Sequence, residues 1–222
     1  MSFTRNMKKK MEKSAQGPLR RSEASGPAVG RDIKKILIAG EGGQGVQTIA
    51  HLICEAAFHK GLKVSFIPNY GVEQRGGVSL AFIQIQDKPV HYPKFEKGDL
   101  VVILSERSVL RTWQYVGPET LVIYNSSFIT PKLLNSQKPR IKNLIGIDAA
   151  NLAAFKLKNA RVFNIIILGA ILGRLGKITF SDMKNALKKQ LGKKYKAKPE
   201  LETLNNDALK MGMELVAVKS KE

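Results

Sequence analysis

Short apolar runs separated by polar turns start at Lys34 and predict an alternating α/β chain. The near-continuous runs are typical of strands buried in a parallel sheet. They fall at residues 35–39, 62–67, 100–105, 121–125 and 143–149. The segment SLAFIQIQ, residues 79–86, alternates apolar and polar side chains instead, which predicts a half-exposed strand. Pro68 is expected to end the second strand.

Apolar residues also recur at helical spacing. Val46, Ile49, Ala50, Ile53, Ala57 and Phe58 predict an amphipathic helix over about 45–60, with Gly61 as its stop. Further helices are expected at about 148–157, 164–175, 182–191 and 200–217. Ser181 could cap the third of these, and Pro199 could start the last. The pattern predicts one three-layer α/β domain over 33–222, with a mostly parallel sheet, a Rossmann-like first βαβ unit and a helical C-terminal portion.

The N-terminal residues 1–32 differ from the rest of the chain. They are polar, rich in Gly, Pro and Ser, and carry eight basic and three acidic side chains. This composition predicts a disordered basic extension, interpreted as dispensable rather than as a targeting segment because Glu12 and Glu23 interrupt the basic pattern. It contains no apolar core of a secretory signal, and no run in the chain reaches 18 apolar residues.

The chain is strongly basic, with a formal net charge of +19. Six lysines fall within residues 188–198, KKQLGKKYKAK. A solvated lysine-rich surface is the favoured interpretation. A nucleic-acid patch is the alternative, but Tyr195 is the one aromatic residue in the segment and no nucleic-acid-binding motif accompanies it.

Residues 38–50, IAGEGGQGVQTIA, join the first strand to the first helix. Gly40, Gly42 and Gly45 fit the G-x-G-x-x-G spacing, and a helix N-terminus offers free amides to an anion. A dinucleotide site also needs an acid about 20 residues on, and the second strand ends VSFIPNYG without one. The loop also lacks the Gly-Lys-Ser/Thr of a P-loop. An anion-binding loop and a purely structural turn both remain open.

A second loop, in PNYGVEQRGGVSLAFIQI (68–85), places Tyr70, Glu73, Arg75, Gly76 and Gly77 between two strands. A Gly-Gly pair makes the backbone conformable. The loop is expected near the C-terminal end of the second strand, where open parallel sheets bind ligands. In the alternative interpretation the loop is self-contained, and Glu73 and Arg75 pair with each other.

These two loops together resemble a known family. AGEGGQGVQTIAHLICEAAFHKG followed by YGVEQRGGVSLAFIQI is similar to the gamma subunit, or gamma domain, of the 2-oxoacid:ferredoxin oxidoreductases, which act on pyruvate, 2-oxoglutarate, 2-ketoisovalerate or indolepyruvate. The resemblance covers about 34–180 and continues through GDLVVIL, IDAANLA and RVFNIIILGAILG, where Asn164 and Gly169 match the family. Val72 and Gln74 depart from its usual residues.

The resemblance implies a reaction and a division of labour. The family oxidatively decarboxylates a 2-oxoacid with coenzyme A, giving acyl-CoA, CO2 and reduced ferredoxin. Thiamine diphosphate, Mg and iron–sulfur clusters are expected in partner subunits of a cytoplasmic complex, with this chain inactive alone. The single Cys54 agrees, because a cluster usually takes four thiolates. The histidines His51, His59 and His91 show no metal-ligand spacing.

The role implied for this chain is to help close the active site, to bind coenzyme A, or both. Gly42, Gly43, Gln44 and Gly45 are expected to face the anion. Tyr70, Glu73, Arg75, Gly76 and Gly77 are expected to line the facing wall, with Arg75 as a fixed charge; the same loops could instead contact a partner subunit. A stand-alone nucleotide-binding protein and a nucleic-acid-binding protein are the alternatives. No catalytic or metal-binding residue is expected.

Overall fold

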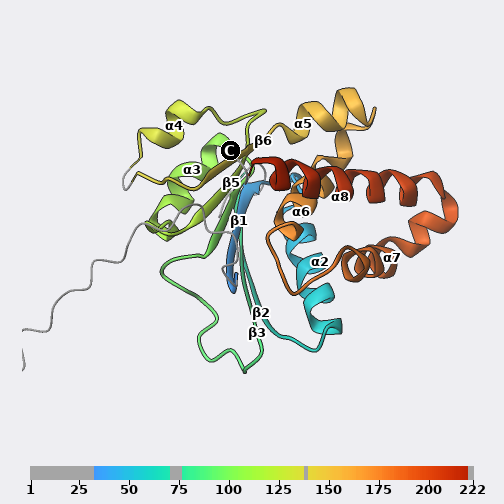
Figure 1. The fold of residues 1–222 in the computed structure, drawn as a ribbon, viewed down its shortest axis with the longest axis horizontal. Coiled ribbons are helices and arrows are strands. Elements are labelled where there is room, and N and C mark those ends of the chain that lie inside the picture. Colours follow the sequence, from blue (N-terminus) through green and yellow to red (C-terminus); the bar gives the residue numbers. More distant parts are fainter. Residues whose placement is uncertain (1–32, 71–76, 138–139, 220–222) are drawn as a thin grey trace, which may run out of the picture.

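The computed structural model describes residues 33–70, 77–137 and 140–219. Six strands form one sheet in the order β2-β3-β1-β4-β5-β6 (Figure 1). The strands are β1 (Lys35–Glu41), β2 (Lys63–Asn69), β3 (Val78–Gln86), β4 (Leu100–Ile103), β5 (Leu121–Asn125) and β6 (Leu144–Ile147). The helices are α2 (Val46–His59), α3 (Glu106–Thr112), α4 (Pro131–Asn135), α5 (Ala149–Asn151), α6 (Phe163–Leu172), α7 (Phe180–Ala197) and α8 (Glu200–Lys219).

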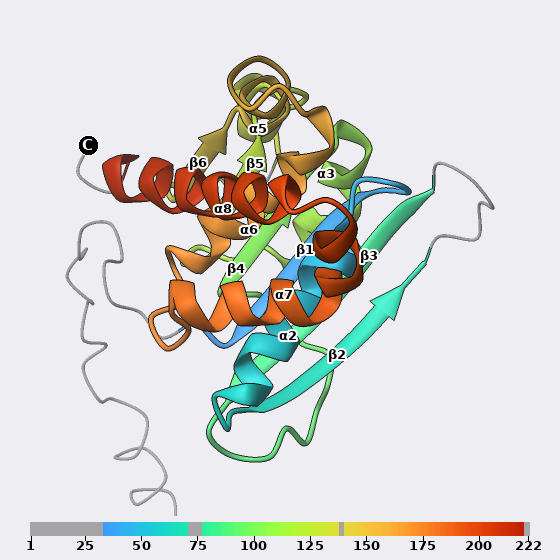
Figure 2. The same ribbon diagram turned by 90° about the vertical axis from the view of Figure 1, so that its right-hand side faces the viewer.

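The sheet is the middle of three layers, as predicted. Helices α2, α6, α7 and α8 cover one face, and α3 and α4 cover the other (Figures 1 and 2). Successive residues of β1 therefore enter different cores: Ile36 and Ile38 face the first, and Leu37 and Ala39 face the second. Because both faces are covered, the central strands need apolar residues at every position, which explains their continuous apolar runs.

Strands β1, β4, β5 and β6 are parallel, whereas β3 pairs antiparallel with both β1 and β2. Strand β2 consequently runs in the same direction as β1, and the first β-α-β unit has a strand inserted between its two strands. Its carboxyl end lies at the same edge of the sheet as the carboxyl end of β1. This edge carries the glycine turn and the two described residues that flank the second loop, Tyr70 and Gly77.

Two details of the hairpin β2–β3 correct the sequence analysis. β3 is not half-exposed: it is buried from Ser79 to Ile85, because β1 and β2 flank it and helices cover the sheet. Its polar side chains are accommodated by hydrogen bonds, since Gln84 donates to the Tyr92 carbonyl and Ser79 accepts from Gln47. β2 also continues through Pro68, which an edge strand tolerates because one side of it needs no ladder hydrogen bond.

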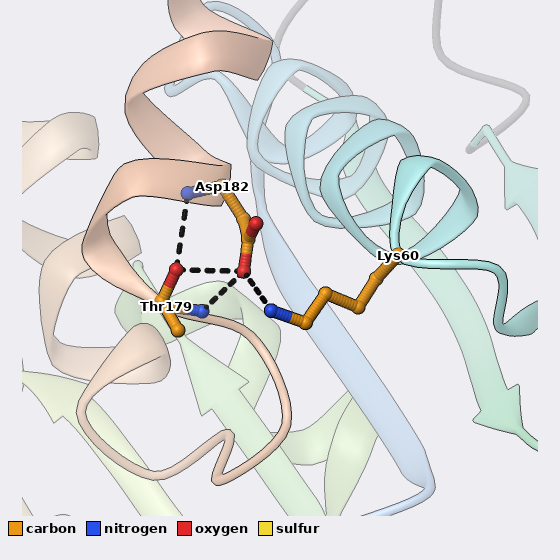
Figure 3. A network of polar contacts seen from close by, with 3 residues as sticks. All are labelled: Lys60, Thr179 and Asp182. Atoms are coloured by element: carbon orange, nitrogen blue, oxygen red, sulfur yellow. Dashed lines mark hydrogen bonds and ion pairs between the residues drawn. The ribbon is translucent and has the colours of Figure 1, made fainter.

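The cap of α7 is Thr179 rather than Ser181. The Thr179 hydroxyl accepts a hydrogen bond from the Asp182 amide (3.2 Å), and the Asp182 carboxylate accepts from the Thr179 amide (2.8 Å), forming a capping box (Figure 3). The same carboxylate accepts from the Lys60 ammonium at 2.9 Å, which ties the end of α2 to the start of α7. These donors, led by the Thr179 hydroxyl, lower the pKa of Asp182 to about 2.

Helices α6 and α8 touch backbone to backbone. A Cβ on Gly169 would collide with the Leu209 carbonyl, and one on Gly212 would collide with the Ile166 carbonyl. The apolar α6 is thereby buried between the sheet and α8. Its sequence is apolar but too short to span a bilayer, so a buried helix was expected. Among the described residues no helix is both long and apolar enough to cross a membrane. The helix predicted at 148–157 is α5 followed by a π-helical turn, Leu152–Lys156.

Candidate functional site

The turn between β1 and α2 exposes its glycines at the carboxyl edge of the sheet. Gly42 and Gly43 are exposed, and Gly43 (φ 92°) and Gly45 (φ 82°) adopt the left-handed conformation that favours glycine. Gln44 holds the turn closed through two hydrogen bonds with Glu41. The Gln44 side-chain oxygen accepts from the Glu41 backbone amide (2.8 Å), and the Gln44 backbone amide donates to the Glu41 backbone carbonyl (3.1 Å). Gln44 therefore shapes the loop, while the two exposed glycines leave its outer surface open.

The N-terminus of α2 has backbone hydrogen-bond donors without a side-chain cap among the described residues. Its N-cap residue is Gly45, which has no side chain to cap it, and its first turn contains no acidic residue. The first intrahelical bond runs from the Ile49 amide to the Gly45 carbonyl (2.9 Å), so the amides of Val46, Gln47 and Thr48 have no partner within the helix. Together with the positive end of the helix dipole, these amides can bind an anion.

Neighbouring elements pack closely around the turn. A Cβ on Gly40 would lie 2.7 Å from the Gln44 side-chain oxygen and 3.0 Å from the Cβ of Leu104, so this glycine lets strand and helix approach. A Cβ on Gly45 would lie 2.5 Å from Nδ2 of Asn164, which comes from the start of α6. Asn164, noted in the sequence as matching the family, thus supports the turn from behind.

The strand register brings the residues that flank the second loop, Tyr70 and Gly77, to the same edge. Glu41 of β1 pairs with Val78 of β3, so Gly77 lies beside the start of the glycine turn. Asn69 pairs with Leu80, which puts Tyr70 at the same edge with 67% of its surface exposed. The structure therefore brings Gly42, Gly43, Gln44 and Gly45 to the same edge as Tyr70 and Gly77. The predicted site residues Glu73, Arg75 and Gly76 lie outside the described residues.

Gln47 connects the first turn of α2 to β3 at this edge, and the sequence did not indicate it. It lies in the first turn of α2, and its Nε2 donates to the Ser79 hydroxyl (2.8 Å) and the Leu80 carbonyl (3.1 Å) of β3. Its Oε1 is buried and has no hydrogen-bond partner among the described residues. The residues around Gln47 in the sequence give no signal of a contact with a strand 32 positions away.

Further along the edge, two groups of polar side chains satisfy one another. The Ser105 and Ser108 hydroxyls lie 2.7 Å apart at the end of β4. After β6, Asp148 accepts from the Ser127 hydroxyl (2.5 Å) and the Asn151 amide (2.9 Å). These groups are engaged within the fold, whereas the amides at the start of α2 have neither an intrahelical partner nor a side-chain cap among the described residues.

The reactive side chains of α2 are occupied in packing and hydrogen bonding. Burial raises the pKa of the Cys54 thiol to about 12, so it packs as a small apolar side chain, as predicted. His51 packs edge-on against Phe66, with ring centroids 4.8 Å apart, and His59 contacts Glu55 at 2.9 Å. Within the described part of the chain, no three His, Cys, Asp or Glu side chains are grouped so as to hold a metal ion.

The inserted strand β3 also bears on the dinucleotide alternative. In a dinucleotide-binding fold, the acid that binds the ribose follows the second strand of the unit. Here β2 is separated from β1 by β3, and the residue that follows it is Tyr70. The glycine turn is therefore present, but within the described residues β2 is followed by Tyr70 and not by an acid.

Comparison with known proteins shows to which family the chain belongs. The family model for pyruvate ferredoxin/flavodoxin oxidoreductase matches residues 35–215, further than the 34–180 resemblance in the sequence. The chain belongs to the pyruvate ferredoxin/flavodoxin oxidoreductase family. Within this family it is of the gamma-subunit type. It is 32% identical over 158 residues to the "Pyruvate/ketoisovalerate oxidoreductases common subunit gamma" of Pyrococcus abyssi, covering 69% of this chain and 84% of that one.

Solved structures of the pyruvate ferredoxin/flavodoxin oxidoreductase family share the fold. The gamma subunit of a keto/oxoacid ferredoxin oxidoreductase from Geobacter sulfurreducens superposes with a TM-score of 0.67 at 21% identity, covering 83% of this chain and 99% of that one. The 2-oxoglutarate:ferredoxin oxidoreductase of Magnetococcus marinus, solved with 2-oxoglutarate, coenzyme A and succinyl-CoA, gives 0.72 at 21% identity. That match covers 85% of this chain and 32% of the longer chain.

Proposed function

We propose that this chain is the gamma subunit that binds coenzyme A and helps to close the active site of a complex that oxidises 2-oxoacids. The observation that carries the proposal is the N-terminus of α2, which has no side-chain cap and lies directly behind the exposed Gly42 and Gly43. Coenzyme A carries several phosphate charges, and free amides at a helix N-terminus are suited to them. The strongly basic chain would add long-range attraction for the same ligand.

The division of cofactors follows from the side chains available. One half-buried cysteine cannot supply the four thiolates that an iron–sulfur cluster usually takes. We therefore assign iron–sulfur clusters, thiamine diphosphate and Mg to partner subunits, which would carry out decarboxylation and electron transfer. This chain would bind and orient coenzyme A, exclude water, and be inactive alone in a cytoplasmic complex.

The second loop would form the facing wall of the site. Tyr70 and Gly77 border the edge on the β2–β3 side, and we propose that Glu73, Arg75 and Gly76 between them complete it. Arg75 would act as a fixed positive charge and as a bidentate hydrogen-bond donor to a phosphate. The 2-oxoacid itself would be bound mostly by other subunits.

A pair of glycine substitutions tests the proposal. Gly43 (φ 92°) and Gly61 (φ 81°) both have left-handed backbones and open space where a Cβ would stand, but only Gly43 lies at the turn. In the reconstituted complex, Gly43→Asp should raise the KM for coenzyme A about tenfold, the effect of like charges roughly 6 Å apart at an effective dielectric near 40.

Gly61→Asp is the control and should leave that KM unchanged, because it has the same backbone strain and adds the same charge at the far end of α2. Turnover at saturating coenzyme A should be similar in both variants. Equal KM values in the two variants would refute the binding role. Dissociation of the Gly43→Asp complex on a sizing column would instead show that the turn is a subunit interface.

A further inference from the structure

The outer surface of α7 is a dense array of lysines. Met183, Ala186 and Leu187 bury one side of this helix against the core, and α7 lies over α2 and beside α8 on the outside of the molecule (Figure 2). Around the rest of the helix, and along its C-terminal half, lies a group of exposed side chains, here named the lysine face. It consists of Lys184, Lys188, Lys189, Lys193, Lys194 and Lys196. No acidic residue occurs in the sequence between Asp182 and Glu200.

These charges are poorly neutralised within the fold. Lys189 pairs with Glu55 of α2. The other five lysines have no ion pair among the described residues. Lys184 and Lys188, and likewise Lys189 and Lys193, stand four residues apart, where like charges on a helix repel each other. The helix therefore keeps an unfavourable charge arrangement, which an acidic partner would relieve.

The composition of the face indicates the kind of partner. Stable subunit interfaces have apolar, lysine-poor centres, and the lysine face includes no exposed large apolar residue. Charged surfaces without an apolar centre suit partners that arrive by electrostatic attraction and leave quickly. Weak electron-transfer encounters belong to this class.

A nucleic acid fits the face less well. The basic residues are lysines without a single arginine, which is the residue suited to two-pronged contacts with phosphates and bases. The aromatic Tyr195 cannot stack on bases, because it is buried and its hydroxyl accepts a hydrogen bond from Asn205 (2.8 Å).

We infer that the lysine face is a docking surface for the acidic electron carrier, of the ferredoxin or flavodoxin class, that takes electrons from the complex. This inference rests on the proposed function, because it requires the chain to be part of a complex that delivers electrons. It does not depend on the coenzyme A site, because the ion pairs that join α7 to α2 involve Glu55 and Lys60 in the C-terminal part of α2, whereas Gly43 precedes its N-terminus.

The test uses the reconstituted complex and a purified ferredoxin of net negative charge. The variant Lys188→Glu/Lys193→Glu/Lys196→Glu reverses three charges of the face. The control, Lys88→Glu/Lys132→Glu/Lys142→Glu, makes the same change in net charge at three exposed lysines elsewhere. The KM for ferredoxin is measured from about 20 to 300 mM NaCl, with a small artificial electron acceptor and the KM for coenzyme A as further readouts.

At low salt, the face variant should raise the KM for ferredoxin about tenfold or more, since electrostatic steering changes association rates by about 10- to 1,000-fold. The salt dependence should flatten in this variant, while the control, the artificial acceptor and the KM for coenzyme A stay near wild type. An unchanged KM for ferredoxin would overturn the inference whatever happens at the coenzyme A site. Loss of assembly would also overturn it, as would loss of oligonucleotide binding with unchanged ferredoxin kinetics.

Discussion

Replacing Gly45 by alanine should destabilise the fold more than the same change at Gly43 or at Gly61. All three positions, Gly43, Gly45 and Gly61, have φ between 81° and 92°. An alanine in this conformation costs about 1–2 kcal/mol. At Gly43 and Gly61 a Cβ would meet nothing within 4 Å, so backbone strain is the whole effect.

At Gly45 a second cost is added. The new Cβ would stand 2.5 Å from Nδ2 and 3.2 Å from Cβ of Asn164, so α6 or the turn must shift. Overpacking of this kind costs about 1–3 kcal/mol, which brings the expected loss to about 2–5 kcal/mol. For a domain of this size, a loss of about 3 kcal/mol lowers Tm by roughly 6–12 °C.

Thermal unfolding of the isolated chain, followed by circular dichroism, measures these differences. Adding Asn164→Ala to Gly45→Ala removes Nδ2 and should recover about 1 kcal/mol relative to the sum of the single changes, as expected for residues in contact. A Gly45→Ala variant no less stable than Gly43→Ala and Gly61→Ala would refute the packing of Asn164 against the turn.

Two further predictions concern contacts that position the site and the lysine face. Because the folded pKa of Asp182 is about 2, below its ordinary 3.8, this carboxylate stabilises the fold above about pH 4 and loses that effect as the pH falls towards 2. Asp182→Asn should therefore be less stable than wild type at pH 6, and urea unfolding should show the gap closing towards pH 2; a constant gap would contradict this. Gln47→Leu leaves the Ser79 hydroxyl without its donor and should raise the KM for coenzyme A in the complex, with Thr48→Val as the neighbouring control; equal values would rule out a positioning role.

The sequence was most informative where one physical cause dominates. Continuous apolar runs predicted the central strands correctly, because both faces of the sheet are covered. The glycine turn was located because left-handed backbone at Gly43 and Gly45 requires glycine. The order of the strands was not predictable, since insertion of β3 between β1 and β2 depends on pairing between distant segments.

Other features were missed for local reasons. The helices α3 and α4 have seven and five residues, too few to establish a helical period. Thr179 stands three residues before Asp182, which is the spacing of a capping box. This spacing indicates the N-cap of α7 better than the presence of Ser181 does. The contact of Gln47 with β3 was invisible because a hydrogen bond across 32 residues leaves no pattern in the chain.

The edge position of β2 has a consequence for aggregation. An edge strand exposes unpaired backbone groups that can recruit a strand from another molecule. Along β2, Lys63 places a charge at the start of this edge, and Pro68 removes one amide near its end. The proline that was expected to end the strand therefore serves a different purpose: it makes the outer edge of β2 a poor template for intermolecular β-sheet, while the inner edge stays paired with β3.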